Sequence, residues 1–579
     1  MNLRRISSTL AFVVVLLMTM ASTPALARPG GGGSYKSSGG SSYKSSSGSS
    51  YKSSSGSGGS SYKSSGGSTY KSSSGSGGGS TYNGSSGGGG SYGGGGSYGG
   101  GSTYSGGGST GSGDGSDSSY VPPPTGVSNS TVKFFFFIVL PLCAVLLFIW
   151  WRRQRDEYAE DLAEYSTGQT IEPPPEGVMP SAPRPGVRRE LEALRAFDPD
   201  FSPVLFDDFL YALYATAQEA RGKGALGELA PYLGATARAQ LRSDPEYVSA
   251  VSAIVIGAMH YIDVLIDEPE ERVKVRVRFE ANYSETLTRK GSGDELERSY
   301  YVIDEWSLER KLTAKSRPPE KVRVFACPNC GAPLSQVRGG TCEYCKEVVT
   351  GGDFDWLVTT VSTLFKEGKG PQLTSTVEEE GTDLDTVVDP GSEKPFAELA
   401  TRDPAFQWPA FEARLELIFR EMQVGWSSRD WMPVRPFLSD NLFQMQVYWI
   451  ETYKQQRLRN VTEDAQIERI VPARLTSDRY YDAITVRVFA SSTDYTVRDG
   501  SDEVVAGSKT KRRAYSEYWT LIRGTDTKGA PSADMVCPKC GGALAITMTG
   551  NCEHCQAKVT SGQFDWVLSR IEQDEVYAG

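Results

Sequence analysis

One segment occurs twice in the chain, and the prediction of the fold starts from it. Residues 198–217 read DPDFSPVLFDDFLYALYATA, and residues 403–422 read DPAFQWPAFEARLELIFREM. Both copies begin with Asp-Pro-x-Phe, and in both the apolar residues then recur every three or four positions, as on one face of an α-helix. Asp198 and Asp403 are candidate helix-start residues, each followed by Pro. Self-similarity at a fixed offset marks a repeated structural unit, so the sequence predicts one module written twice.

The two copies remain similar beyond this first helix. A Pro-x-Leu segment, a strand with alternating apolar residues and a Trp-x-Leu strand follow in the same order. We expect second helices over Tyr247–Met259 and Asn441–Lys454. Helices followed by an antiparallel run of strands indicate an α+β fold. The paired positions are Pro231 and Pro436, Leu233 and Leu438, Val273–Val277 and Ile484–Val488, and Trp306–Arg310 and Trp519–Arg523.

Eight of the nine cysteines form two copies of the pattern C-x2-C-x11-C-x2-C. Two such knuckles bring four thiolates around one ion, so the pattern predicts two structural zinc ions. A site closed by four cysteines leaves no open position for a catalytic water. A redox pair and disulfides are the competing interpretations. The predicted ligands are Cys327, Cys330, Cys342 and Cys345 in the first copy and Cys537, Cys540, Cys552 and Cys555 in the second.

A Phe-Asp-Trp tripeptide follows each cysteine motif, at residues 354–356 and 564–566. Apolar residues then recur at helical spacing, through Leu364 in the first copy and Ile571 in the second. We therefore expect a helix after each motif, which packs the zinc ribbon onto its own module.

The first 151 residues predict a targeting signal, a low-complexity region and a membrane anchor. Two early arginines, an apolar stretch and the small-x-small sequence Ala25-Leu-Ala27 are typical of a signal peptide, with an uncleaved anchor as the alternative. The Gly/Ser/Tyr-rich tract that follows has too few apolar residues for a core. Residues 134–151 are uncharged and long enough to span a bilayer, and the arginines within 152–155 place the body in the cytoplasm.

These features divide the chain into nine segments. They are a signal peptide (1–27), an extracytoplasmic disordered region (28–130), a transmembrane helix (131–151), a linker (152–187), module 1 (188–325), zinc ribbon 1 with its helix (326–366), an acidic linker (367–395), module 2 (396–530), and zinc ribbon 2 with its helix (531–579).

The composition excludes one class of partner and argues against catalysis. The 579 residues carry a net charge of −10. Phosphate backbones bind Lys- and Arg-rich surfaces, so we expect no nucleic-acid binding, by the zinc ribbons or elsewhere. Only two histidines are present, His260 and His554. We also find no pair of polar residues repeated inside the apolar strands, and therefore expect a protein that is not an enzyme.

The modules resemble the Tim44-like domain family. The resemblance rests on the Asp-Pro-x-Phe start, the Phe-rich helix, the Pro-x-Leu segment, the Val-rich strand and the Trp-x-Leu strand, over residues 188–315 and 396–525. It implies a cone-shaped fold similar to nuclear transport factor 2, with an apolar pocket between helices and sheet. The best-understood member of the family tethers chaperone machinery to a membrane translocation channel. The doubled zinc ribbon and the fixed anchor depart from that mitochondrial protein. The signal peptide and the single anchor fit a bacterial plasma (inner) membrane protein better.

Taken together, the sequence predicts a single-pass membrane protein with an extracytoplasmic N-terminus. Its expected function is that of a non-catalytic scaffold, which assists protein transport by binding translocation machinery or a transported substrate. Membrane lipid is a further expected partner, and the two modules are expected to be able to pack as a pseudo-dimer. The alternatives are a small-molecule or enzymatic pocket inside the cone, or a lipid-binding module.

Overall fold

The computed structural model describes residues 133–153, 171, 186–242, 247–288, 295–368, 373, 382–574 and 576–579. The chain divides into two compact units, Ser42–Val145 and the remainder, and each is described by itself. The predicted signal peptide and low-complexity region lie outside the described residues, as does most of the predicted linker 152–187.

Residues 133–153 are helical and contain a π-helical turn, η1 (Phe135–Val139). This turn lies just before Pro141, whose missing N–H removes one bond from an α-helical ladder. In the part of the chain that the structure describes, no helix is both long enough and apolar enough to cross a membrane.

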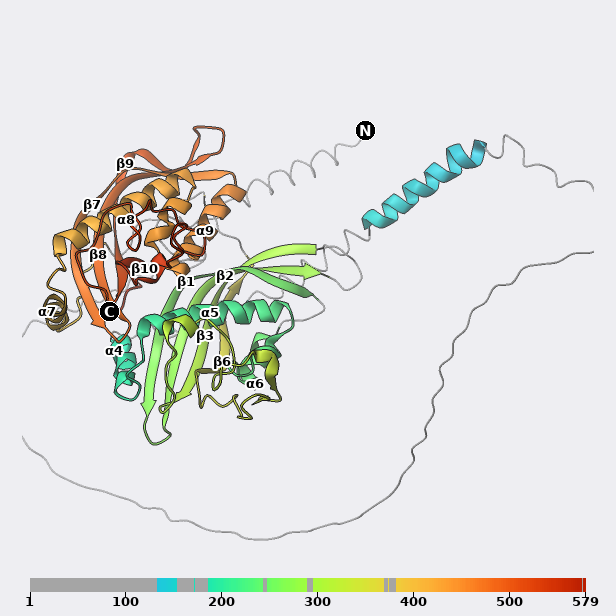
Figure 1. Ribbon diagram of the computed structural model, residues 1–579. Coiled ribbons are helices and arrows are strands. Elements are labelled where there is room, and N and C mark those ends of the chain that lie inside the picture. The colour runs from blue at the N-terminus through green and yellow to red at the C-terminus, as the bar shows by residue number, and fades with distance from the viewer. Residues whose placement is uncertain are drawn as a thin grey trace, which may run out of the picture. The chain divides into compact units, whose positions relative to one another are not determined.

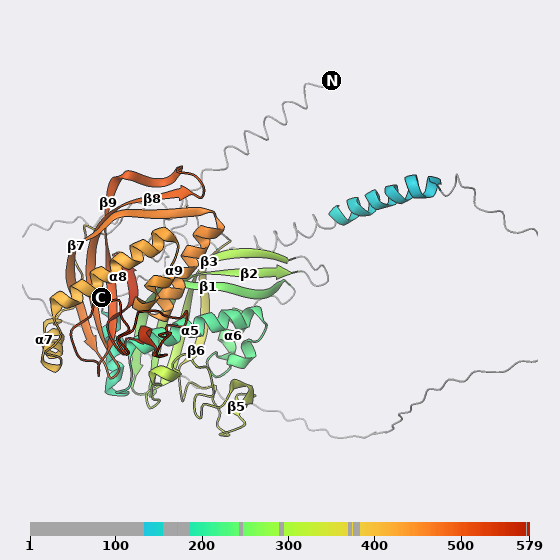
Figure 2. The same ribbon diagram turned by 45° about the horizontal axis from the view of Figure 1, so that its top comes forward.

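Two antiparallel four-stranded sheets form the body (Figures 1 and 2). The strand order is β1-β2-β3-β6 in the N-terminal half, residues 186–368, and β7-β8-β9-β10 in the C-terminal half, residues 382–579. The two sheets thus share one topology, and the α+β prediction is confirmed. The strands are β1 (Val248–Asp267), β2 (Arg272–Thr288), β3 (Glu295–Lys311), β6 (Leu357–Glu367), β7 (Leu458–Ser477), β8 (Tyr481–Arg498), β9 (Val504–Gly524) and β10 (Val567–Gln573).

One long helix packs against each sheet, α5 (Pro203–Gly222) on β1 and α8 (Trp408–Ser428) on β7 (Figure 1). Both bury the apolar face that the repeated segment predicted. The Ser202 hydroxyl accepts a hydrogen bond from the Leu205 N–H (3.3 Å) and caps α5, and Gln407 is the residue before α8. The expected helix-start roles of Asp198 and Asp403 are therefore wrong. The shorter helices are α4 (Val187–Glu192), α6 (Ala235–Leu241), α7 (Glu393–Arg402) and α9 (Asp440–Gln455), with 3-10 turns η2 (Ala193–Ala196), η3 (Leu226–Leu229), η4 (Pro319–Lys321) and η6 (Met432–Phe437).

Aromatic rings fill the space between helix and sheet. In the N-terminal half the Tyr214 ring on α5 lies 4.8 Å from the Phe279 ring and 5.1 Å from the Trp306 ring, between centroids. In the C-terminal half Phe419 on α8 lies 6.1 Å from Trp519. All five side chains are buried, so these rings supply much of each core.

The Asp-Pro-x-Phe motif supplies a buried ion pair in each half. Asp198 lies 3.0 Å from Arg310 at the end of β3, and Asp403 lies 2.8 Å from Arg523 at the end of β9. All four side chains are at most 2% exposed. The pair therefore joins the segment before the long helix to the end of the third strand.

The Phe-Asp-Trp tripeptide completes the same cluster. The Arg310 guanidinium lies 5.0 Å from the centre of the Trp356 ring, and the Arg523 guanidinium lies 4.7 Å from that of Trp566. Planar guanidinium groups stack favourably on aromatic faces. The motifs that the sequence repeats thus meet at one point in each half. We call these clusters the arginine locks.

Three segments that were expected to be helices are strands. Residues 247–259 lie mostly in β1, and the helices expected after the cysteine motifs are β6 and β10. Each of these strands contains β-bulges, such as the register shift between Ser307 and Leu308 in the β3–β6 pairing. A bulge turns the next side chain to the other face, so buried residues recur every three or four positions. In β6 the buried Val358, Val361 and Phe365 therefore imitate a helical pattern.

The second helix of each half lies directly after the Pro-x-Leu segment. In the C-terminal half α9 confirms the helix expected over Asn441–Lys454, whereas in the N-terminal half the equivalent helix is the much shorter α6. The Pro-x-Leu segments also pair in parallel with the strand that follows each ribbon, Leu233 with Val358 and Leu438 with Leu568.

Charged side chains join the two halves. Arg570 on β10 pairs with Asp207 on α5 at 2.7 Å, and Arg474 on β7 pairs with Glu192 on α4 at 2.6 Å. The halves therefore contact each other within one unit, and a pseudo-dimeric arrangement stays a prediction.

We predict that Asp198→Asn lowers the free energy of unfolding by about 3 kcal/mol, because it removes the carboxylate that pairs directly with the buried Arg310. Equilibrium urea denaturation of the purified chain measures the change. The control is Glu398→Gln, which breaks an exposed pair with Lys394 and should cost less than about 0.5 kcal/mol. Equal effects of the two substitutions would contradict the role of the arginine lock.

Candidate functional site

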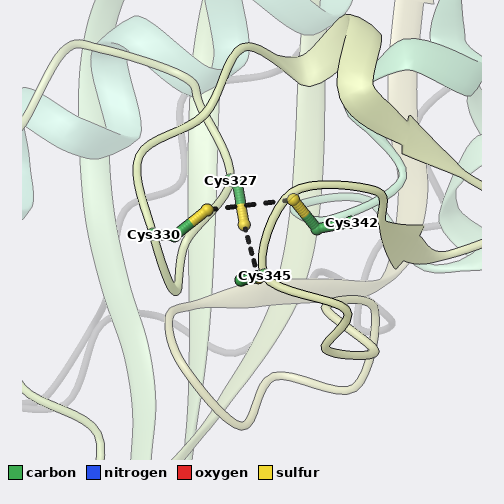
Figure 3. A group of neighbouring side chains, drawn as sticks. All are labelled: Cys327, Cys330, Cys342 and Cys345. Carbon is green, nitrogen blue, oxygen red and sulfur yellow. Dashed lines mark hydrogen bonds between the residues drawn. The ribbon is translucent and has the colours of Figure 1, made fainter.

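Each cysteine motif gathers four sulfur atoms at one point. In the first cluster, shown in Figure 3, the sulfurs of Cys327 and Cys345 are 3.9 Å apart, and those of Cys330 and Cys342 are 3.8 Å apart. The corresponding distances in the second cluster are 3.8 and 4.0 Å. Within each cluster all ligand atoms lie within 4.8 Å of one another. The second cluster consists of Cys537, Cys540, Cys552 and Cys555.

These distances fit metal binding. Four thiolates at about 2.3 Å from a central ion form a tetrahedron with edges of about 3.8 Å. A disulfide would need sulfurs about 2 Å apart, and all eight cysteines are free. The eight predicted residues therefore form two groups that could each hold a metal ion, and the disulfide alternative does not fit their geometry.

Tight backbone turns set up each pair of cysteines. The Gly331 N–H donates to the Cys327 carbonyl (2.8 Å), and the Lys346 N–H donates to the Cys342 carbonyl (2.8 Å). Gly331 has a φ of 76°, which glycine adopts without steric cost, and Lys346 has a φ of 65°. The second cluster repeats both turns with Gly541 and Gln556.

The same turns favour the thiolate form of one ligand. Backbone N–H groups of Cys345 and Tyr344 point at the Cys342 sulfur and lower the pKa of its thiol to about 7. Hydrogen bonds to a charged form stabilise that form. Since a metal binds thiolates, these N–H groups prepare the site for an ion.

Each ribbon is anchored to the Pro-x-Leu region of its own half. The Tyr232 hydroxyl donates to the Ala326 carbonyl at the start of ribbon 1 (2.6 Å). In ribbon 2 the Arg435 side chain donates to the Met548 carbonyl (2.9 Å), and Lys558 pairs with Asp440 at 2.8 Å. The Pro-x-Leu segment of each half therefore contacts both the ribbon and the last strand, β6 or β10. It links the four cysteines of the ribbon to the sheet.

Comparison with known proteins identifies a Tim44-like domain at residues 392–532. The match lies within the C-terminal half and ends before Cys537. It confirms the resemblance for module 2, and the resemblance of residues 188–315 to the same family stays a prediction. No curated protein matches the chain.

A second candidate site lies inside the halves. Asp304 on β3 is buried and accepts hydrogen bonds from the Tyr214 hydroxyl (2.8 Å) and the Thr363 hydroxyl (2.7 Å). Burial raises the pKa of Asp304 above its ordinary value. Glu517 occupies the equivalent place on β9 and accepts from the Trp519 indole N–H (3.0 Å). One buried acidic position is therefore repeated inside the strands, which the sequence analysis did not identify.

The alignment that revealed the modules also contained this signal. Asp304 and Glu517 both stand two residues before the aligned tryptophans, Trp306 and Trp519. A single acidic residue in a strand is normally assigned to its solvent face, which is why the repeat was missed.

The N-terminal half has a further buried charge cluster that the C-terminal half lacks at the aligned positions. Arg221 and Lys366 both approach the same Glu285 oxygen, at 2.7 and 3.2 Å. Trp426 and Thr496 stand where the sequence alignment places Arg221 and Glu285. Since the C-terminal half folds with the same topology without this cluster, the fold itself does not require these charges.

We predict that the chain binds two metal ions and that Cys327→Ser and Cys537→Ser each remove one, because a tetrahedral site loses a ligand. Elemental analysis of the purified variants gives the stoichiometry. Cys143 lies outside both motifs, so Cys143→Ser should retain both ions. A Cys327→Ser chain that still holds two ions would contradict the assignment.

We also predict a pH-dependent effect of Asp304→Asn. The folded chain holds the Asp304 proton more tightly than the unfolded chain does, because burial raises the pKa. Its contribution to stability is therefore full at acid pH and is lost as the pH rises through the raised pKa. Asparagine has no such proton, so the stability of the variant relative to wild type should increase between about pH 4 and pH 7. Thermal unfolding over this range measures the trend, and a flat or falling difference would disprove it.

Proposed function

We propose that this protein is a membrane-anchored, non-catalytic scaffold that binds a protein partner and assists protein translocation at the plasma membrane. The observation that carries the proposal is the Tim44-like domain at residues 392–532, which suggests a role in protein translocation or binding. Two halves of the same topology also offer two partner surfaces on one chain, and linked sites bind more tightly than either alone.

Zinc is the metal that we propose for both ribbons. Four thiolates form a soft, closed donor set, which suits Zn²⁺ in a structural role. In ribbon 1 the ion would be held by Cys327, Cys345 and the other two cysteines of the group, and ribbon 2 would bind its ion in the same way. An ion enclosed in this way stabilises a segment that is too small to form a hydrophobic core of its own. This role supports a scaffold, because it gives each half a rigid appendage.

The proposed anchor rests on the sequence alone, on the uncharged segment 134–151 and on the arginines at 152–155, which we place on its cytoplasmic side. This orientation supports reduced thiols in the body, as metal binding requires. The N-terminal Gly/Ser/Tyr-rich region would then lie outside the cytoplasm.

Binding of a small polar molecule in the N-terminal half is the second candidate function. The buried cluster of Arg221, Glu285 and Lys366 favours it, because buried charges that a fold does not need are common at functional sites.

Crosslinking in intact membranes tests the proposal most directly. The chain is crosslinked in the cells that produce it, purified through a tag after Gly579, and the captured proteins are identified. We expect translocation components or transported proteins, and we expect them to be lost with the Cys327→Ser/Cys537→Ser variant and kept with Cys143→Ser. Recovery of lipid or small molecules alone would contradict the scaffold and favour the second candidate.

A further inference from the structure

Part of the linker between the two halves lies on the outer face of the C-terminal sheet. We call residues 382–389 the strap. The strap N–H of Asp389 donates to the Ala473 carbonyl on β7 (2.8 Å), and that of Val387 donates to the Tyr518 hydroxyl on β9 (2.8 Å). The strap thus crosses three neighbouring strands, with β8 between these two contacts.

Arg487 on β8 is the centre of this contact. Its guanidinium donates to the Leu384 carbonyl (2.7 Å), the Thr386 hydroxyl (3.2 Å) and the Thr382 carbonyl (3.3 Å). Its side chain is only 1% exposed and also pairs with Asp574 at 3.0 Å. One side chain therefore binds alternate residues of the strap, two of them through main-chain carbonyls. Such contacts recognise an extended backbone and place few demands on its side chains.

The strap is held by polar contacts and hardly at all by apolar burial. The side chains of Leu384, Val387 and Val388 remain 59%, 40% and 46% exposed. Segments with few buried apolar contacts open locally at a small free-energy cost compared with global unfolding. The strap can therefore leave the sheet while the core beneath it stays folded.

The N-terminal half shows that this face does not need a cover. Arg276 on β2 corresponds to Arg487, since Val275 and Val277 flank it as Val486 and Val488 flank Arg487. The Arg276 side chain is 43% exposed and pairs with Glu305 at 3.3 Å. A sheet of the same topology thus leaves this arginine open to solvent.

The charges of strap and surface are complementary. The strap contains Asp383, Asp385 and Asp389, and Asp389 pairs with Arg189 at 2.8 Å and with Arg474 at 3.5 Å. Three arginines thus contact the strap, namely Arg189 on α4, Arg474 on β7 and Arg487 on β8. Arg474 also pairs with Glu192 at 2.6 Å, and Arg487 pairs with Asp574.

We propose that the outer face of β7, β8 and β9 is a docking surface for an extended acidic peptide, which the strap occupies in cis. A partner with such a segment binds by displacing the strap. The partner's role in translocation rests on the function proposed above. The surface itself is tested with a synthetic peptide, so the two proposals can fail separately.

The test compares the full chain with a strapless variant, in which Gly/Ser residues replace 382–389 at equal length. A fluorescent peptide of residues 381–391 (GTDLDTVVDPG) is titrated into each and followed by anisotropy. We expect binding to the strapless chain and at least about tenfold weaker binding to the intact chain, because a tethered strap competes at an effective concentration near millimolar. Raised salt should weaken the binding.

Two arginine variants of the strapless chain form the matched control. Arg487→Ala should weaken peptide binding at least about tenfold, and Arg276→Ala, at the equivalent place in the other half, should leave it unchanged. The proposal is overturned by a folded strapless chain that does not bind, by equal binding to the intact chain, or by equal effects of the two variants.

Hydrogen exchange of the unaltered chain covers the case in which the strapless variant fails to fold. The amides of Val387 and Asp389 should exchange much faster than those of the β8–β9 ladder, since the strap opens separately. Equal protection of strap and ladder would mean that the strap belongs to the core and would overturn the proposal.

Discussion

The buried Asp–Arg pair of each arginine lock is the interaction on which the rest of the structure depends. A buried charge is costly unless it is paired, so Asp198 and Arg310 constrain each other strongly. Through this constraint the start of the long helix and the end of the third strand are held together. The Trp356 ring then covers the guanidinium, which brings the next strand, β6, into register beside β3.

In the sequence, the cysteine ribbon lies between the arginine and the tryptophan that stack on each other in each half. In the N-terminal half the chain leaves β3 at Lys311, forms the ribbon, and returns to Arg310 at Trp356. The order is the same between Arg523 and Trp566. A metal ion that cross-links such a loop lowers the entropy lost in closing it, so the ion should support the lock and the final strand. We therefore expect each ribbon to stabilise the sheet of its own half.

The features of the structure that follow from residue spacing could be predicted from the sequence. An offset of 205 residues revealed the duplication, and the cysteine pattern located both sulfur clusters. The predictions from spacing are wrong where bulges change the period of the buried residues, in β6, β10 and part of β1, for which helices were expected. The spacing of residues also does not show which charged side chains are buried. The prediction for Asp198 was wrong and Asp304 was not identified, because Arg310 and Tyr214, which bind them, lie 112 and 90 residues away in the sequence.

If a metal in each ribbon holds the arginine lock and the last strand of its half, removal of the metal should loosen that strand. Hydrogen exchange of the full chain, before and after treatment with a chelator, measures this. We expect amides of β6 and β10 to lose protection on chelation, while amides in the β1–β2 and β7–β8 ladders largely keep theirs. Unchanged protection of β6 and β10 in metal-free protein would contradict this expectation.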